Sequence, residues 1–293
     1  MSVHRTVLVL LVGACWSSGL LLLFSAEAAG RPAGQGRMHP VPSGDHPGVK
    51  TSALRGRIAL THGSAALLVS YPSGQEAFAR YVLSATTMYL PAVERYLAAP
   101  LARSNIEIRI LEGGGSNKGD WIEIGPGSPG NPALLFHELN HYWFWYSAPG
   151  RQIWLIEGLM SFLPWAMDAA GFLKLTAAER ASIPAGWGFT WRGVPPAFPP
   201  LLVDDGGPFR YPTTYKLQYI VHHELGSVKY RSCLHAMARA WPLKDVAAFL
   251  AILDGQRHQD WRALLGGWLF NAPFGRIKPA DFLDSDRDGL NNL

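Results

Sequence analysis

Hydrophobic residues beyond position 50 follow two different periods, one typical of strands and one typical of helices. A period of two predicts short strands at residues 57–61, 65–71, 106–111 and 120–124. Residues 75–97 instead place their apolar side chains on one side at helical spacing. The glycines at 113–115 lack the residues that would complete a phosphate-binding loop, so they predict a turn. This region is therefore expected to be rich in strands, with one long helix.

From residue 131 onward the pattern is helical. Asn131 suits an N-cap and Pro132 a first-turn position, which predicts a helix from about 132 to 147. A second helix is predicted at 152–169, followed by a proline-rich loop at 184–212. Later helices are predicted at residues 215–225, 228–240, 246–253 and 261–268. The whole pattern indicates one α+β domain at residues 51–280, in which a strand-rich part precedes a helical lobe.

The first 28 residues have the pattern of an export signal. Met1–Arg5 is short and basic, the apolar stretch Val7–Phe24 follows, and Ala26 and Ala28 stand at the positions that a signal peptidase reads. We expect a secretory signal cleaved near Ala28 and an exported protein, periplasmic or extracellular. Two alternatives stay open, because the stretch is long enough for an uncleaved membrane anchor and Val12–Cys15 resembles a bacterial lipobox.

Composition and charge exclude several classes of protein. With 48% hydrophobic and 16% charged residues, the 293-residue chain can bury enough surface to fold. The net charge is +4 and no run of five like charges occurs, which argues against nucleic acid as a partner. Of the two cysteines, Cys15 falls in the signal, so no disulfide scaffold is expected and Cys233 is predicted to be a buried, inert thiol. Residues 29–50, rich in Gly, Pro and His, predict a flexible leader.

The helix predicted at 132–147 carries two histidines four residues apart. His137 and His141 lie on one helix face, so both imidazoles can reach one metal ion. Glu138 lies about 100° around the helix and can take a proton from water on that ion. The flanking residues are apolar nearly all round, which argues against the alternative of two surface histidines beside a salt-bridged glutamate. We therefore predict that these buried groups have partners or a metal.

Glu157 supplies a third candidate ligand on the next predicted helix. The segment 142–156 that separates it from His141 leaves room for a tight turn and an antiparallel return. A carboxylate there completes a set of three protein ligands and leaves the fourth position to water. Gly158 is expected to let the histidine helix and the second helix approach closely.

Together, the motif HELNH at residues 137–141 and the motif WLIEG at residues 154–158 resemble the gluzincin metallopeptidases. This group includes thermolysin and aminopeptidase N, and the chain looks most similar to the bacterial peptidase MA-like domains. The resemblance is specific over about residues 130–165 and extends elsewhere only to the order of strands and helices. It implies a thermolysin/aminopeptidase-like zincin domain of the α+β class, with a small mixed sheet before the helical lobe.

The resemblance also implies roles for individual residues. One zinc ion would be bound by His137, His141 and Glu157, with Glu138 as the general base. An edge strand of the sheet would bind extended peptide by strand addition, and residues 120–124 are the candidate for that edge. Residues 125–130 lack the acidic residue of the Gly-x-Met-Glu-Asn signature of aminopeptidase N relatives, so exopeptidase specificity is not supported.

Gluzincins also need a donor that stabilises the oxyanion, often a Tyr or His of a later helix. Tyr215 is the candidate because it is expected to open a helix just after a loop, and the alternative for it is an ordinary packing role. Other candidates in this part of the chain are Tyr211, Tyr219, His222 and His223. Ser161, four residues after Glu157, stands where thermolysin-like enzymes place an Asp that supports a zinc-bound histidine.

The tail at residues 281–293 is rich in aspartate. Asp284, Asp286 and Asp288 occupy positions 1, 3 and 5 of a calcium-type loop, with Gly289 at position 6. This arrangement resembles the repeats of dockerins and type-3 thrombospondin modules. The bidentate acid of position 12 would lie beyond Leu293, so a solvated tail is expected in preference to a Ca²⁺ site.

These observations predict an exported zinc metallopeptidase that hydrolyses peptide bonds with a metal-activated water and Glu138 as general base. The expected partner is a peptide or protein substrate, with a membrane involved only if the N-terminal segment is retained as an anchor. Two other functions stay open. One is a catalytically inert gluzincin-fold binding module at the cell surface, and the other is a zinc hydrolase that acts on something other than peptides.

Overall fold

The computed structural model describes residues 51–111, 114–126, 132–144, 153–186, 211–243, 245–269 and 276. All of them belong to one of the two units into which the chain divides, Asp45–Leu293. The predicted signal, the leader at 29–50 and the acidic tail at 281–293 lie outside the described residues. Among the helices in the described part of the chain, none combines the length and apolar character needed to cross a membrane.

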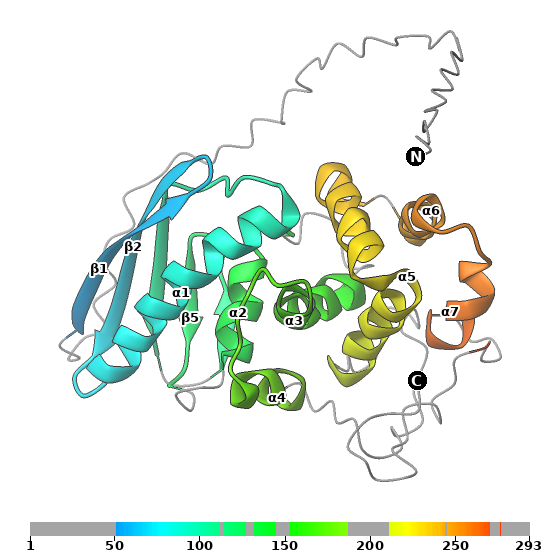
Figure 1. Ribbon diagram of the computed structural model, residues 1–293. Coiled ribbons are helices and arrows are strands. Elements are labelled where there is room, and N and C mark those ends of the chain that lie inside the picture. The colour runs from blue at the N-terminus through cyan, green and yellow to red at the C-terminus, as the bar shows by residue number, and fades with distance from the viewer. Residues whose placement is uncertain are drawn as a thin grey trace, which may run out of the picture. The chain divides into compact units, whose positions relative to one another are not determined.

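The strands of the described ranges form a mixed, five-stranded sheet (Figure 1). β1 (Thr51–Leu60) and β2 (Gly63–Pro72) make an antiparallel hairpin, and β2 pairs parallel with β3 (Asn105–Ile110). β3 pairs parallel with β5 (Trp121–Ile124), which pairs antiparallel with the short β4 (Gly115–Asn117). The order is β1-β2-β3-β5-β4, so the two edges are β1 and β4.

The strand predicted to be the edge is therefore an inner strand. β5 lies between β3 and β4, and the edge belongs to β4, which begins at Gly115 within the glycine run that predicted a turn. β4 has the sequence Gly-Ser-Asn, with no apolar side chain to alternate, so the hydrophobic pattern contains no signal for it. Its position comes from pairing with β5, where Ser116 stands opposite Glu123.

Helix α1 (Glu76–Leu97) covers one face of the sheet and connects the parallel strands β2 and β3 (Figure 1). Every second residue of β3 is buried, as expected for a sheet with one covered face. Near the end of α1 the buried Glu94 accepts hydrogen bonds from the backbone N–H of Thr61 at 2.5 Å and of Leu101 at 3.3 Å. This carboxylate joins the helix to the turn between β1 and β2.

The helical part follows the sheet in the chain. Its helices are α2 (Ala133–Asn140), α3 (Ile153–Ala169), α4 (Ala177–Gly186), α5 (Tyr211–Ala240), α6 (Val246–Gln256) and α7 (Trp261–Leu269). All but α4 agree in place with predicted helices. Helices α4 and α5 extend into the two ends of the segment predicted to be a loop, 184–212, and its residues 187–210 lie outside the described residues.

Helix α2 is shorter than the segment 132–147 that the sequence predicts. It begins after Pro132, which takes the N-cap position without a side-chain hydrogen bond, while the predicted cap Asn131 lies outside the described residues. Beyond its end the backbone turns with i→i+3 hydrogen bonds, such as Trp143 N–H to the Asn140 carbonyl at 3.0 Å. The apolar residues of this turn continue the helical pattern, which explains the overestimated length.

Helix α5 consists of two helical segments that meet at Gly226. The φ of 71° and ψ of 161° at this residue interrupt the helix, and the positive φ favours glycine. The sequence predicted separate helices at 215–225 and 228–240, so the break lies where it was expected. The two segments are drawn as differently oriented coils in Figure 1.

The second segment of α5 holds the predicted inert cysteine. Cys233 is free and buried, and its burial raises the pKa of the thiol to about 12. The thiol therefore stays protonated at neutral pH, as expected for an unreactive cysteine. Arg231 on the same segment donates from Nε to the Tyr96 carbonyl at 2.8 Å, which satisfies the C-terminal end of α1.

Helices α3 and α5 approach closely at Gly158. A Cβ at this position would lie 2.7 Å from the backbone oxygen of Thr214 in α5, closer than real Cβ atoms come. The sequence predicted that Gly158 would allow α3 to approach the histidine helix α2 closely. This prediction is wrong, because the atoms nearest to an added Cβ belong to Thr214 of α5. The glycine instead permits contact with the first turns of α5.

Gly158→Ala is expected to lower the free energy of unfolding by about 1–3 kcal/mol, because the methyl group meets backbone atoms that no rotamer change can move away. Gly255→Ala is the matched control, since Gly255 also lies in a helix but has no atom within 4 Å of an added Cβ. Stability of the control is expected to stay the same or rise slightly. Chemical denaturation measures both, and equal losses would contradict a steric limit at Gly158.

Candidate metal centre

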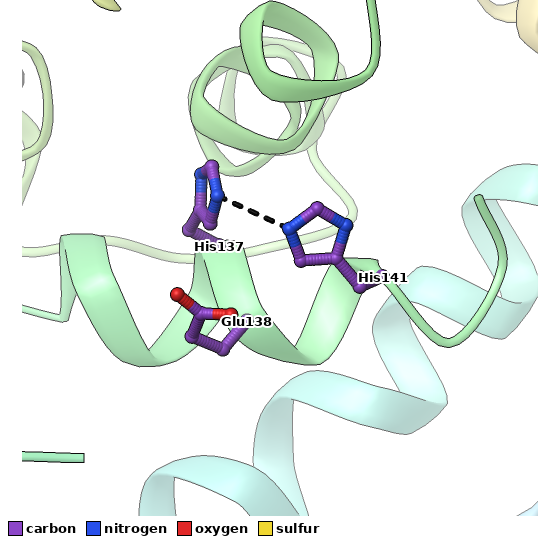
Figure 2. Close-up of side chains that lie close together, drawn as sticks. All are labelled: His137, Glu138 and His141. Carbon is purple, nitrogen blue, oxygen red and sulfur yellow. Dashed lines mark hydrogen bonds between the residues drawn. The ribbon is translucent and has the colours of Figure 1, made fainter. Parts of the chain in front are cut away.

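His137 and His141 point toward each other from one side of α2, with Glu138 on the same helix beside them (Figure 2). Their Nε2 atoms are 3.2 Å apart and both rings are buried. His141 is the C-cap of α2, and its φ of −60° and ψ of −15° keep it one helical turn after His137. One potential ligand atom from each of His137, Glu138 and His141 lies within 4.8 Å of the others.

Glu157 brings a carboxylate from α3 to the same point. Its Oε2 lies 2.9 Å from His137 Nε2, and its Oε1 lies 3.8 Å from His141 Nε2. Together with the 3.2 Å between the imidazoles, these distances bracket the roughly 3.3–3.4 Å expected between the ligands of a tetrahedral ion with bonds of about 2.0–2.1 Å. The donor atoms that the sequence singled out therefore have separations and a chemistry that are compatible with a bound zinc ion.

Ser161 orients the ring of His137. The serine Oγ lies 3.1 Å from His137 Nδ1, and its hydroxyl donates to the backbone oxygen of Glu157 at 2.7 Å. Because the hydroxyl proton is used in that bond, Oγ accepts the Nδ1–H of the histidine. This tautomer leaves the lone pair of Nε2 directed toward His141 and Glu157. The spacing of four residues from Glu157, which the sequence showed, places Ser161 where such support is needed.

Burial shifts the protonation equilibria of the site. It lowers the pKa of His141 to about 4, with the neighbouring His137 as a further cause, so the imidazole is neutral at neutral pH and able to bind a metal. Burial also raises the pKa of the Glu138 carboxyl; His137 opposes this shift and the charge of Glu157 adds to it. A raised pKa makes the Glu138 carboxylate a better proton acceptor.

The edge of the sheet is attached to α2 at Glu138. Asn117 of β4 donates from Nδ2 to the backbone oxygen of Glu138 at 2.9 Å, and its Oδ1 accepts the N–H of Gly119 at 2.8 Å. The strand therefore lies directly beside the residue predicted to be the general base. Sequence reasoning missed this contact, because an asparagine after a glycine run is typical of any turn.

The predicted oxyanion donor lies in a packed environment. Helix α5 begins at Tyr211, so Tyr215 does not open the helix as expected. Tyr215 is completely buried, and its ring makes an edge contact with Phe162 at 5.2 Å between centroids. His222, another candidate, has its Nε2 3.1 Å from Ser227 Oγ. The role of Tyr215 toward an oxyanion stays a prediction, and its contact with Phe162 matches the packing alternative.

No protein family profile and no curated protein sequence matches the chain. Solved structures do match. An M1 zinc metallopeptidase from Deinococcus radiodurans superposes with a TM-score of 0.56 at 13% identity, covering 78% of this chain and 52% of that chain. A mutant M1 zinc metallopeptidase of the same organism, bound to a Tyr-Ser-Ala substrate, gives 0.55 at 12% identity with 78% and 54% covered.

Aminopeptidase A of Legionella pneumophila, in complex with aspartic acid, gives a TM-score of 0.51 at 13% identity, covering 75% of this chain and 28% of that chain. This chain thus spans about half the length of the Deinococcus chains that it matches. At such identities the likeness concerns the fold alone. The mixed α/β arrangement, with its five-stranded sheet and following helices, is similar to M1 peptidase domains.

Proposed function

We propose that this protein is a zinc-dependent metallopeptidase of the gluzincin type. The observation that carries the proposal is the convergence of the His137 and His141 Nε2 atoms with the Glu157 carboxylate, at separations of 3.2, 2.9 and 3.8 Å. These three residues would bind one zinc ion. The fold shared with M1 zinc metallopeptidases supports the same conclusion. Export of the protein, inferred from residues 1–28, is part of the proposal.

The residues around the metal position have distinct tasks. A bound zinc ion supplies Lewis-acid chemistry, polarising the scissile carbonyl and lowering the pKa of water. Glu138 takes the proton from the attacking water and delivers it to the leaving amine, and its raised pKa suits both steps. Ser161 holds the His137 ring in the tautomer whose Nε2 is available as a ligand.

We propose that the substrate is a peptide in extended form, bound along β4. β4 is an edge of the sheet, and Asn117 links it to the backbone of Glu138. An extended peptide can pair with such an edge through main-chain hydrogen bonds. The structures with Tyr-Ser-Ala and with aspartic acid are of peptidases that have a similar fold, which supports this class of substrate.

The test combines metal analysis with a peptide digest. The purified chain is expected to contain one zinc ion, which a chelator removes, and to cleave a mixed peptide library in a zinc-dependent manner. Mass spectrometry of the products identifies the bonds that are cut and separates endopeptidase from exopeptidase action. Bound zinc without cleavage of any peptide would favour the inert binding module, and absence of zinc binding would contradict the proposed function.

Ser161→Ala is expected to weaken zinc binding about 10- to 100-fold, the usual loss for a group that supports a metal-bound histidine. Ser232→Ala is the matched control, because Ser232 makes the same bond to the carbonyl four residues earlier, from Oγ to Val228 at 3.2 Å, and it lies on α5. The control is expected to keep wild-type affinity. Competition with a zinc-binding dye measures both variants, and equal affinities for the two would contradict the role of Ser161.

A further inference from the structure

Asn140 joins three helices next to the candidate metal centre. Its side chain is completely buried. Its Nδ2 donates to the backbone oxygen of Met160 in α3 at 2.9 Å, and its Oδ1 accepts the hydroxyl of Tyr89 in α1, also at 2.9 Å. The ring of Tyr89 in turn stacks on Phe136 of α2, with centroids 3.9 Å apart. Both polar ends of the Asn140 amide are thus used to hold α2 against its neighbours.

The Met160 carbonyl can accept the hydrogen bond of Asn140 because a proline stands four residues later in α3. In an α-helix the carbonyl of residue 160 would accept the N–H of residue 164. Residue 164 is Pro164, which lies inside α3 and has no N–H. The amide of Asn140 supplies a donor to the Met160 carbonyl in place of the missing one. A buried carbonyl needs such a partner, so this contact is fixed in position.

The contact lies within one turn of the candidate zinc ligands on both helices. On α2, Asn140 directly precedes His141 and follows His137 by three residues. On α3, Met160 directly precedes Ser161 and follows Glu157 by three residues. Any change in the separation of α2 and α3 at this contact therefore moves the imidazoles relative to the Glu157 carboxylate.

We propose that Asn140 is a positioning residue for the metal centre. Anchored to Tyr89 and to the Met160 carbonyl that Pro164 leaves open, it sets the separation of α2 and α3 at which the ligand atoms converge. Asn140 acts through the ligands and does not touch the ion. The inference rests on the proposed zinc site, and it adds a determinant of metal affinity that lies outside the ligand set.

The experiment compares full-length variants with a matched control. Tyr89→Phe removes one hydrogen bond of Asn140 and keeps the ring that stacks on Phe136. Asn140→Leu removes both bonds, and Pro164→Ala restores an N–H that competes for the Met160 carbonyl. Tyr230→Phe is the control, because Tyr230 is equally buried and its hydroxyl donates to the side-chain oxygen of Gln218 at 3.0 Å within α5.

Three quantities are measured for each variant: the zinc dissociation constant by competition with a chelating dye, the visible spectrum of the Co²⁺-substituted protein, and the unfolding temperature without metal. Asn140→Leu is expected to weaken zinc binding about tenfold, the lower end of the loss that follows removal of a group bonded directly to a metal ligand, because Asn140 acts one contact further out. Tyr89→Phe should weaken it by a smaller factor with an altered Co²⁺ spectrum. Tyr230→Phe should lower the unfolding temperature and keep wild-type affinity and spectrum.

Pro164→Ala separates positioning from stability. Alanine is the better helix former, so the metal-free protein is expected to unfold at the same or a higher temperature. Its zinc affinity should nevertheless fall, because the new N–H competes with Asn140 for the Met160 carbonyl. An unchanged affinity would show that Pro164 does not contribute to the positioning. If wild type binds zinc and Tyr89→Phe matches Tyr230→Phe in affinity and spectrum, Asn140 has only a structural role. If wild type binds no zinc, the proposed function fails as well.

Discussion

Glu138→Gln is expected to bind zinc like the wild type and to hydrolyse peptides about 10²- to 10⁴-fold more slowly, the contribution usual for a general base. Glutamine has nearly the size of glutamate, so the buried position keeps its packing. The Asn117 amide bonds to the backbone oxygen of residue 138, and this contact survives the substitution. What is lost is the carboxylate, the only part of Glu138 that can take a proton from water.

The measurement pairs turnover of a cleaved peptide with zinc content, so that loss of chemistry is separated from loss of metal. Glu224→Gln is the matched control, because Glu224 and Glu138 are both 6% exposed. Glu224 forms ion pairs with Arg257 at 3.5 Å and with Arg276. The control should lose stability and retain kcat. A zinc-loaded Glu138→Gln that cleaves peptides at the wild-type rate would show that another group takes the proton.

Local sequence patterns predicted the parts of the site that depend on one helix. The spacing of four residues between His137 and His141 and between Glu157 and Ser161 is a property of the α-helix itself. Helical spacing and alternation also located the strands β1 and β2, the helix α1 and the break in α5 near Gly226. These features require no knowledge of which segments meet in space.

The features that the sequence did not predict depend on contacts between distant segments. β4 has no apolar side chain of its own, and its place at the edge comes from pairing with β5. The contact of Asn140 with Met160 crosses from α2 to α3. Pro164 signals that a carbonyl four residues earlier lacks its usual donor, but it does not say which side chain takes the place. Pairing partners are set by the tertiary fold, which local periodicity does not contain.

Glu157→Ala is expected to weaken zinc binding by more than about 100-fold. This loss is larger than the one expected for Ser161→Ala, because Ser161 only supports a ligand whereas Glu157 is proposed to be one. The substitution removes a carboxylate whose oxygens lie 2.9 and 3.8 Å from the two imidazole Nε2 atoms, and it leaves two of the three proposed protein ligands. A 100-fold larger dissociation constant lowers the zinc-dependent stabilisation by about 2.7 kcal/mol at a fixed, saturating zinc concentration. The rise in unfolding temperature on adding zinc should therefore be much smaller than in the wild type.

Glu94→Ala distinguishes this effect from the general cost of losing a buried glutamate. Glu94 is 2% exposed, and its carboxylate accepts hydrogen bonds from the backbone N–H groups of Thr61 and Leu101. In Glu157, by contrast, the carboxylate faces the two imidazoles. Without metal, the control should be destabilised, because two backbone N–H groups lose their acceptor. Its response to zinc should nevertheless equal that of the wild type, since His137, His141 and Glu157 are intact. A Glu157→Ala protein that keeps the full zinc-induced rise in unfolding temperature would exclude Glu157 as a ligand and leave the two histidines without their third partner.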